Sequence, residues 1–385
     1  MVNFNALCLV ASKTRGNLEP CAATACEISQ SKFTYGWYNL VFEIGFSDKT
    51  FWIARIPIVQ EDHDGNEEEI TNELESEVAT MKYVKNNTTI PVPVIFAFSS
   101  TPHPDVGCRF ILMESLPGVP GTGRFKEFVP DEYKQKTFRQ FVDIKLQLSQ
   151  CRFPRIGRLR EDANVYKIES FRPFGCLYSD PCGPFDTSID YYYSVRKHDL
   201  QKAVNDRSAQ SDISQEQRFG TWLRLQAVPV IVQLEFNHGP FPLDHPDLNV
   251  ANLLFDNEFN ITGVIDWTGA FVAPIESFGL MPIEFPRYSK NSKDSNVNLI
   301  WNLIEDAERL IDPSTPLSKY IQSSRSAGLA AFEIGDRRGE KITMQLCQSL
   351  VRSMYGDQAD YTMVKSMFEN SCWVKALSLG REESH

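Results

Sequence analysis

The sequence lacks the features that mark several large classes of protein. No stretch of its 385 residues approaches the roughly 18 uncharged apolar residues that a membrane-spanning helix needs. The nine cysteines contain no Cys-x-x-Cys pair, and neither they nor the six histidines have the paired spacing of a zinc site. Basic residues are also fewer than acidic ones: the chain has 39 Lys and Arg against 50 Asp and Glu, which gives a net charge of −11. This deficit argues against nucleic acid or an anionic membrane as a partner, because each needs a cationic face.

The composition favours a folded, cytoplasmic protein. Hydrophobic residues make up 42% of the chain and include 26 Phe, which is enough apolar surface to exclude a disordered chain. The apolar run at residues 4–12 has no basic segment before it and no small-residue cleavage site, so it predicts a first helix rather than a signal peptide. An odd number of cysteines without paired spacing indicates reduced thiols, and we therefore expect a cytoplasmic location.

The N-terminal third predicts an antiparallel sheet accompanied by one helix. Five strands are predicted, at residues 26–34, 38–46, 50–57, 92–98 and 108–114. The first three are separated by short, turn-like segments, as in an antiparallel meander. A helix is predicted over residues 67–85, where four apolar residues recur at spacings of four, four and three. The Pro-Gly segment at 115–118 indicates a boundary between a lobe over residues 1–116 and a second over 117–385.

The second lobe shows mainly helical periodicity. Helices are predicted at residues 131–151, 215–236 and 297–311, with two more after Ser318 and Glu340. Residues 153–208 are rich in Gly, Pro, Tyr and Asp and predict an insertion with weak secondary structure. Long irregular segments in compact proteins are often binding elements, so we expect this insertion to face a substrate.

The residues with the clearest chemical meaning lie in segments 244–256 and 264–267. Asp247 and Asn252 stand five apart in a Pro-containing loop, and Asp266 ends a short predicted hairpin. Phosphoryl transfer uses such a set: an amide oxygen and a carboxylate hold Mg²⁺ on the phosphates, and a separate carboxylate deprotonates the attacking hydroxyl. Asp247 is then the catalytic base, Asn252 and Asp266 the metal ligands, and His245 a structural residue of the loop.

Each of these residues taken alone could equally cap a helix or a turn. The combined pattern favours the chemical interpretation. It consists of His-x-Asp, four residues and Asn, followed by an apolar strand that ends in Ile-Asp-Trp.

Through these motifs the chain resembles the aminoglycoside phosphotransferase and choline kinase family, and looks closest to its fungal members. The resemblance rests on residues 33–57, 77–95, 110–118, 183–187 and, most specifically, 245–267. It implies a bilobal, protein-kinase-like α+β fold, with a nucleotide-binding N-terminal lobe and a catalytic, substrate-binding C-terminal lobe. It also implies ATP and Mg²⁺ as cofactors.

The resemblance further assigns the nucleotide-binding residues. It places Gly36, Tyr38 and Asn39 over the phosphates, although a glycine in a hairpin turn is weak evidence alone. It places backbone groups of Glu114 and Leu116 against the adenine edge. The third strand of a kinase carries a lysine that holds the phosphates, whereas Arg55 stands there in this chain. Arginine can grip a phosphate through two parallel donors, yet the two residues are not interchangeable.

The predicted helix offers a partner for Arg55. At 100° per residue, Glu77 lies within about 20° of Ile70, at the edge of the apolar stripe, whereas Glu75 points away from it. A carboxylate on that face is costly unless a cation meets it, so we predict an Arg55–Glu77 ion pair. Glu73 is the next candidate, and the alternative is that Glu77 extends to solvent.

Three functions stay open from the sequence. The favoured one is an ATP- and Mg²⁺-dependent phosphotransferase acting on a hydroxyl of a small molecule; the net charge of −11 is compatible with a cationic acceptor. The second is a pseudokinase, suggested by Arg55, and the third is a kinase fold turned to another reaction or to ligand binding. A protein kinase is disfavoured because no Ala-Pro-Glu element follows Asp266.

Overall fold

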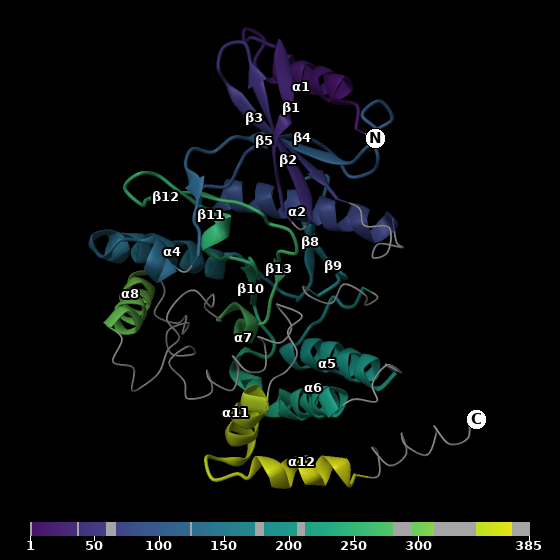
Figure 1. Cartoon of the computed structure of the whole chain (residues 1–385), viewed down its shortest axis with the longest axis vertical. Coiled ribbons are helices and arrows are strands. Elements are labelled where there is room, and N and C mark those ends of the chain that lie inside the picture. The colour runs from purple at the N-terminus through teal and green to yellow at the C-terminus, as the bar shows by residue number, and fades with distance from the viewer. Residues whose placement is uncertain are drawn as a thin grey trace, which may run out of the picture.

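A computed structural model describes residues 2–36, 38–58, 67–123, 125–173, 181–205, 212–279, 295–311 and 344–371. The chain forms two lobes, with a sheet-containing N-terminal lobe above a larger, mainly helical one (Figure 1). The first sheet is antiparallel with strand order β1-β2-β3-β5-β4. Its strands are β1 (Cys26–Tyr35), β2 (Asn39–Phe46), β3 (Phe51–Pro57), β4 (Ile95–Ser99) and β5 (Phe110–Glu114). All five predicted strands are confirmed, but β4 begins later than the predicted residue 92, where Pro91 and Pro93 withhold backbone donors.

Helices cover both faces of this sheet. Helix α1 (Phe4–Leu18) is capped by the Asn3 side chain, which accepts a hydrogen bond from the backbone of Ala6, and it packs against the face that includes Leu112. Helix α2 (Glu67–Asn87) packs its Leu74 and Val78 against Ile111, on the opposite face. Side chains of successive strand residues alternate between faces, so the two helices enclose the sheet. The helix predicted beside the sheet is α2, and the predicted first helix is α1.

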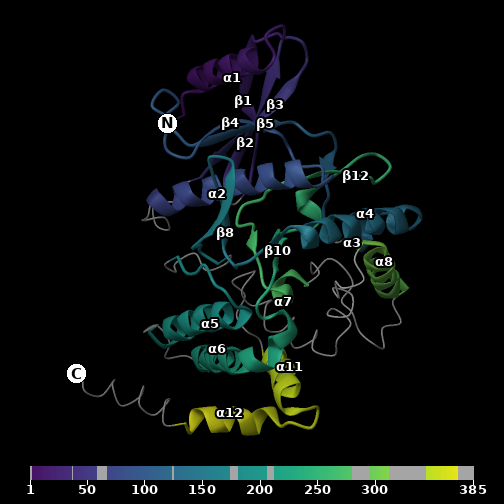
Figure 2. The same ribbon diagram turned by 180° about the vertical axis from the view of Figure 1, so that it is seen from behind.

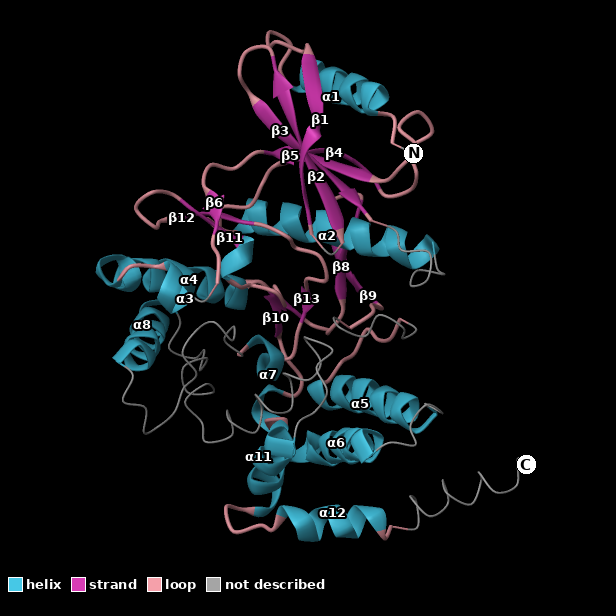
Figure 3. Ribbon diagram, viewed as in Figure 1, coloured by secondary structure: helices cyan, strands magenta, loops and turns pink. Residues whose placement is uncertain are grey.

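The C-terminal lobe combines helices with short strands (Figure 3). Its described helices are α3 (Phe125–Phe128), α4 (Asp131–Gln150), α5 (Ser188–Asn205), α6 (Asp212–Ile231), α7 (Ile275–Phe278), α8 (Ser295–Ile311), α11 (Met344–Tyr355) and α12 (Tyr361–Glu369), with 3-10 turns η1 (Leu234–Phe236) and η2 (Val250–Asn252). Its strands are β6 (Val119–Pro120), β7 (Arg152–Phe153), β8 (Arg158–Asp162), β9 (Val165–Glu169), β10 (Phe241–Asp244), β11 (Leu253–Phe255), β12 (Ile261–Val264) and β13 (Phe271–Val272).

These strands form three small sheets that carry the loops of the lobe. The first sheet of this lobe contains β13, β10 and β7, and the second contains β12, β11 and β6. The third is a hairpin in which β8 pairs with β9. One continuous core holds the lobe together and includes Phe138 and Phe141 of α4 and the fully buried Trp267. β6 follows the inter-lobe connection and pairs with β11 of this lobe, and the boundary at 116/117 stays a prediction.

The prediction of weak secondary structure for residues 153–208 is wrong for much of the segment. The β8–β9 hairpin and helix α5 lie within it, while residues 174–180 and 206–208 lie outside the described residues. Strand β8 reads Arg-Leu-Arg-Glu-Asp, a charged sequence that apolar alternation does not identify. Its charges meet charges on α2, which only the tertiary structure shows. Figure 2 shows β8 beside α2, seen from behind.

The remaining helical predictions agree in part. Helix α6 ends at Ile231, before the predicted residue 236, and η1 follows it. Helix α11 follows Glu340 as predicted, whereas the helix predicted directly after Ser318 lies outside the described residues. Among the helices that the structure describes, none has both the length and the apolarity needed to cross a membrane.

Candidate active site

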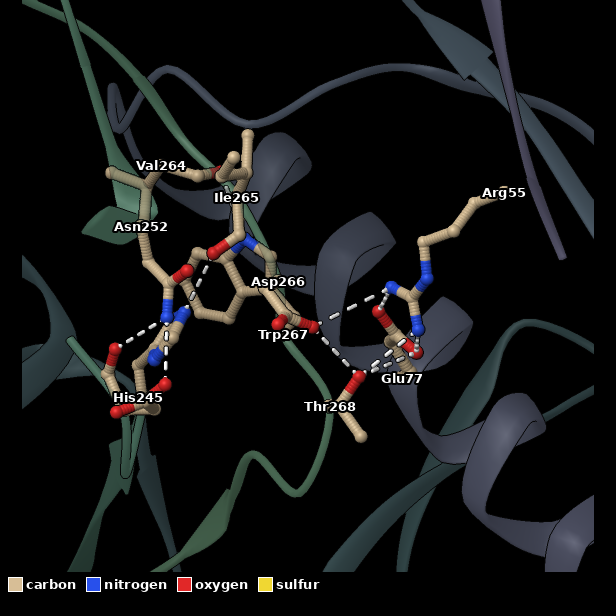
Figure 4. Close-up of polar contacts among 10 residues, drawn as sticks. Arg55, Glu77, His245, Asn252, Val264, Ile265, Asp266, Trp267 and Thr268 are labelled. Carbon is tan, nitrogen blue, oxygen red and sulfur yellow. Dashed lines mark hydrogen bonds and ion pairs between the residues drawn. The ribbon is translucent and has the colours of Figure 1, made fainter. Parts of the chain in front are cut away.

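The β11–β12 hairpin sets Asn252 beside Asp266. Leu253 pairs with Val264, and beyond this pair the Ile265 N–H donates to the Asn252 carbonyl at 3.0 Å. Antiparallel register therefore brings residues 14 apart in sequence to neighbouring positions at the open end of the hairpin (Figure 4). Asp266 has a positive φ of 58°, uncommon for a residue other than glycine, and the chain turns there out of the strand direction.

Asp247 lies in the loop between β10 and η2, where two amide side chains hold its carboxylate. The Asn252 side-chain nitrogen donates to the Asp247 carboxylate at 2.9 Å and to its carbonyl at 2.8 Å. The Asn249 side-chain nitrogen donates to the other carboxylate oxygen at 2.7 Å. Asn249 also caps η2, because its side-chain oxygen accepts from the Ala251 N–H. The orientation of the carboxylate is thus set by residues of its own loop.

His245 ties this loop to the hairpin. Its Nε2 lies 3.1 Å from the Ile265 carbonyl, which can only accept, so Nε2 carries the proton. The ring is buried and meets Trp267 edge to face, with ring centroids 4.8 Å apart. Burial lowers the pKa of His245, so the imidazole is neutral. His245 has the structural role that the sequence predicts for it.

Arg55 of β3 and Glu77 of α2 form the predicted ion pair. One terminal nitrogen of Arg55 contacts Glu77 Oε1, and the other donates to Oε2 at 2.6 Å, so the contact is bidentate. The side chains are only 8% and 3% exposed. Burial alone would lower the pKa of Arg55, but the adjacent Glu77 carboxylate outweighs it and raises that pKa. Glu75 instead pairs with Arg160 at 2.6 Å.

Thr268 connects this ion pair to Asp266, and sequence reasoning missed it. Its hydroxyl accepts from Arg55 at 3.0 Å and donates to Asp266 Oδ1 at 2.9 Å. The Glu77 carboxylate is 3.5 Å away, so the hydroxyl proton goes to the nearer Asp266. Arg55 itself lies 3.9 Å from Asp266 Oδ1. A single Thr two residues after Asp266 gives no signal in the sequence that it meets residues 191 and 213 positions earlier.

The residues predicted over the phosphates lie in the β1–β2 hairpin. The Gly36 N–H donates to the Asn39 carbonyl at 3.0 Å, Tyr38 is exposed and Asn39 is buried. A Cβ placed on Gly36 would meet no atom within 4 Å, so packing does not require glycine at this turn.

The connection between the lobes contains the predicted adenine-binding segment. The Glu114 N–H already donates to the Val94 carbonyl at 2.8 Å, which leaves its carbonyl as the backbone group it could offer a ligand. The Leu116 side chain packs beside Gly263, where an added Cβ would approach it to 2.9 Å. Leu116 is therefore anchored to strand β12 of the C-terminal lobe.

Comparison with known proteins places this architecture in a family. The model of the phosphotransferase enzyme family matches residues 29–277, which include α2, the whole 245–268 segment and the first sheet except for the first three residues of β1. The chain belongs to the phosphotransferase enzyme family.

Fungal proteins are among the relatives of this phosphotransferase-family chain. A subtelomeric hrmA-associated cluster protein of Aspergillus fumigatus is 32% identical over 63% of this chain and 58% of its own length. The clavilactone A biosynthesis cluster protein Y of Ampulloclitocybe clavipes is 27% identical over 61% of this chain and 59% of its own. The chain thus spans less than two thirds of the length of these curated relatives.

Similar solved structures are more distant in sequence. A candidate fructosamine-3-kinase from Thermobifida fusca is 12% identical, with a TM-score of 0.50 over 90% of this chain and 99% of that chain. The macrolide 2'-phosphotransferase MphH from Brachybacterium faecium is 14% identical, with a TM-score of 0.46 over 93% of this chain and 99% of that chain. The first likeness shows the fold alone, and it agrees with the bilobal, kinase-like architecture.

The donor set at the hairpin fits magnesium rather than zinc. Within the part of the chain that the structure describes, no three His, Cys, Asp or Glu side chains gather as a metal site. Magnesium is commonly held by one or two protein oxygens, with phosphates and water completing the shell. Asn252 turns its nitrogen toward Asp247, so its oxygen lies on the other side of the amide, and the Asp266 side chain is 41% exposed. These two oxygen donors suit such a site.

Proposed function

We propose that this protein transfers the γ-phosphoryl group of ATP to a hydroxyl of a small molecule in a Mg²⁺-dependent reaction. The observation that carries the proposal is the linkage of three polar groups. Asn252 binds Asp247 directly, and its carbonyl accepts from the N–H of Ile265, the residue before Asp266. Thr268 in turn links Asp266 to the Arg55–Glu77 pair. Phosphoryl transfer depends mainly on positioning and electrostatics, which such a connected set provides.

Asp247 is the proposed catalytic base. Its two carboxylate oxygens each accept one amide hydrogen bond, from Asn249 and Asn252, and an ionised carboxylate has about four acceptor positions. Lone pairs therefore remain for the proton of an acceptor hydroxyl. The amide donors also hold the carboxylate in one orientation, which favours proton transfer along a fixed direction.

Asn252 and Asp266 are the proposed ligands of Mg²⁺. The ion would neutralise charge on the transferring phosphoryl group and orient it. The protein would contribute the Asn252 amide oxygen from one side of the hairpin and the Asp266 carboxylate from the other. Thr268 would hold the carboxylate in place, because its hydroxyl donates to Asp266 Oδ1 at 2.9 Å.

The N-terminal lobe is proposed to bind the nucleotide. Arg55, held by Glu77, would supply positive charge to the phosphates, and the Gly36–Tyr38–Asn39 turn would cover them. The open space at Gly36 supports this assignment, since a turn without packing neighbours leaves room for a ligand to approach the backbone. The adenine edge would meet the Glu114 carbonyl and a backbone group of Leu116.

One observation favours a second candidate, a pseudokinase that binds a ligand without turnover. Both terminal nitrogens of Arg55 already have partners, in Glu77 and Thr268. An arginine held this way has fewer donors for a phosphate than a lysine, whose ammonium is a compact point charge. A kinase fold turned to another reaction would show neither metal-dependent ATP binding nor phosphoryl transfer.

Calorimetric titration of ATP with and without Mg²⁺ tests the proposal. The wild type should bind ATP in a metal-dependent manner, and Asp266→Ala should lose that dependence. Asp143→Ala removes an exposed carboxylate on α4 and should bind as the wild type does. Absence of binding to the wild type would overturn the kinase assignment.

A second measurement separates the enzyme from a pseudokinase. With a panel of hydroxyl acceptors that includes amino sugars and choline-like amines, wild type should release ADP in an acceptor-dependent reaction. Asp247→Ala should keep ATP affinity and lose this transfer. Transfer retained in Asp247→Ala would refute its role as base, and ATP binding without transfer to any acceptor would favour the pseudokinase.

We also propose a cytoplasmic location and a cationic acceptor. The described cysteines at positions 8, 21, 26, 108, 151, 182 and 347 are free thiols, as is usual in a reducing compartment. The net charge of −11 is compatible with a positively charged acceptor, because acidic surfaces concentrate cations.

A further inference from the structure

Helix α2 is attached to the C-terminal lobe by a row of charges. Glu69 pairs with Arg158 at 2.7 Å, Glu75 with Arg160 at 2.6 Å and Lys82 with Glu161 at 2.8 Å. Asn72 adds a hydrogen bond from Arg160 at 2.9 Å. All the partners on the other side belong to β8, which lies against α2 in both ribbon views (Figures 1 and 2).

The Glu69–Arg158 pair differs from the others in its burial. Its side chains are 2% and 7% exposed, whereas those of Lys82 and Glu161 are 37% and 22% exposed. Exposed pairs contribute little to stability, whereas removal of one partner of a buried pair is strongly destabilising. Replacement of Arg158 should therefore perturb the contact between α2 and the hairpin more than replacement of a residue in either of the other two pairs.

The other end of the hairpin is fastened to the sheet that precedes the Asp247 loop. Gly157, directly before β8, exchanges two backbone hydrogen bonds with Val272 of β13, at 3.2 and 2.8 Å. β13 pairs with β10, which ends at Asp244 and leads into the Asp247 loop. The fit at Gly157 is tight, since an added Cβ would lie 2.4 Å from the Glu169 carbonyl oxygen. The hairpin thus spans from the sheet beside the catalytic loop to the helix that carries Glu77.

We propose that Arg158 is a positioning residue that acts through Glu69 on α2 and so keeps Glu77 against Arg55. The β8–β9 hairpin would then couple the two halves of the site: the Asp247 loop below and the Arg55–Glu77 pair above. Nucleotide affinity becomes dependent on a residue that touches neither the nucleotide nor the ion pair. This inference rests on the proposed function for its binding readout, but the position of α2 can be tested without ATP.

Replacement of Arg158 provides the test. Arg158→Met removes the charge at similar length, and Arg158→Lys keeps it. Lys167→Gln is the matched control, because Lys167 pairs with Asp162 within the hairpin at 2.7 Å and both side chains are more than half exposed. The two measurements are ATP–Mg²⁺ affinity by calorimetry and amide hydrogen exchange across α2, each on the full chain.

Arg158→Met should weaken ATP–Mg²⁺ binding by about tenfold, within the range expected for coupled neighbouring sites. Arg158→Lys should lose less ATP–Mg²⁺ affinity than Arg158→Met, and Lys167→Gln should bind ATP–Mg²⁺ as the wild type does. Exchange should rise in α2 around Glu77 and stay unchanged in β2 and β3. In a Glu77→Gln background, Arg158→Met should cause little further loss of affinity, because both changes act through the same pair. A general loss of stability would instead add to the Glu77→Gln effect.

The outcomes separate the two proposals. If wild type binds no ATP, the proposed function fails, and hydrogen exchange alone decides whether Arg158 positions α2. Unchanged exchange around Glu77 in Arg158→Met, or binding losses that add fully to those of Glu77→Gln, would overturn the inference. If Arg158→Met does not fold, the Glu69→Gln/Arg158→Met double variant removes both charges and replaces it in the same comparison.

Discussion

The buried Arg55–Glu77 pair yields the sharpest prediction about stability. Arg55→Met keeps most of the side-chain volume and removes the only cation that the described contacts give to Glu77. The Glu77 carboxylate is then left in a site where its side chain is 3% exposed. Removal of one partner of a buried pair costs about 3–5 kcal/mol, so we expect the free energy of unfolding near neutral pH to fall by that amount.

The loss should depend on pH in a defined direction. Burial raises the pKa of Glu77, the guanidinium of Arg55 opposes this rise, and the Asp266 carboxylate adds to it. Without Arg55 the folded chain keeps Glu77 protonated at a pH where the unfolded chain has ionised it. A raised folded-state pKa gives stability that is complete below the unfolded pKa of about 4.3 and is lost as pH rises through the folded value. The loss in free energy of unfolding of Arg55→Met relative to wild type should therefore be smaller at about pH 5 than at about pH 7.5.

Urea unfolding followed by circular dichroism at those two pH values measures both effects. The Arg55→Met/Glu77→Gln double variant is the control, because it removes both charges and should be more stable than Arg55→Met alone. A loss under about 1 kcal/mol would mean that the pair behaves as an exposed one. A pH-independent loss, or a double variant no more stable than the single one, would likewise refute the reasoning.

Three further predictions concern residues around the site, each measured by urea unfolding. Trp267→Ala should lower the free energy of unfolding by about 3–5 kcal/mol, because Trp267 is fully buried between His245 and the core. A change near zero would contradict that packing. Burial lowers the pKa of His245, so its contribution to the free energy of unfolding is complete above about pH 6.5 and is lost as pH falls. His245→Asn should therefore flatten the dependence of the free energy of unfolding on pH in this range. An unchanged pH dependence would exclude His245 as its source. Gly118→Ala should lower the free energy of unfolding by at least about 1 kcal/mol, since the φ of Gly118 is +111° and the new Cβ would lie 2.8 Å from the Phe255 carbonyl oxygen. Wild-type stability of this variant would show that the connection between the lobes relaxes freely.

Local spacing in the sequence was sufficient to predict which polar residues of the candidate site lie close together. Asp247 and Asn252 are five residues apart in one loop, and Asp266 follows a hairpin short enough that its register is nearly fixed by the sequence. The Arg55–Glu77 pair could also be predicted, because helical periodicity places a carboxylate on a buried face and a buried carboxylate requires a cation. The match of the phosphotransferase family model to residues 29–277 agrees with the resemblance those motifs suggested.

Only the tertiary structure decided how the lobes are joined. Thr268 links Asp266 to Arg55, and Arg158 links the hairpin to Glu69, across separations of 213 and 89 residues. Neither contact leaves a pattern in the sequence, because a single polar residue has no periodicity and its partner is chosen by long-range packing. The charged strand β8 was missed for the same reason: it is stabilised by charges on α2 rather than by an apolar face of its own. Sequence determines the chemistry available in each segment, and tertiary packing decides which segments meet.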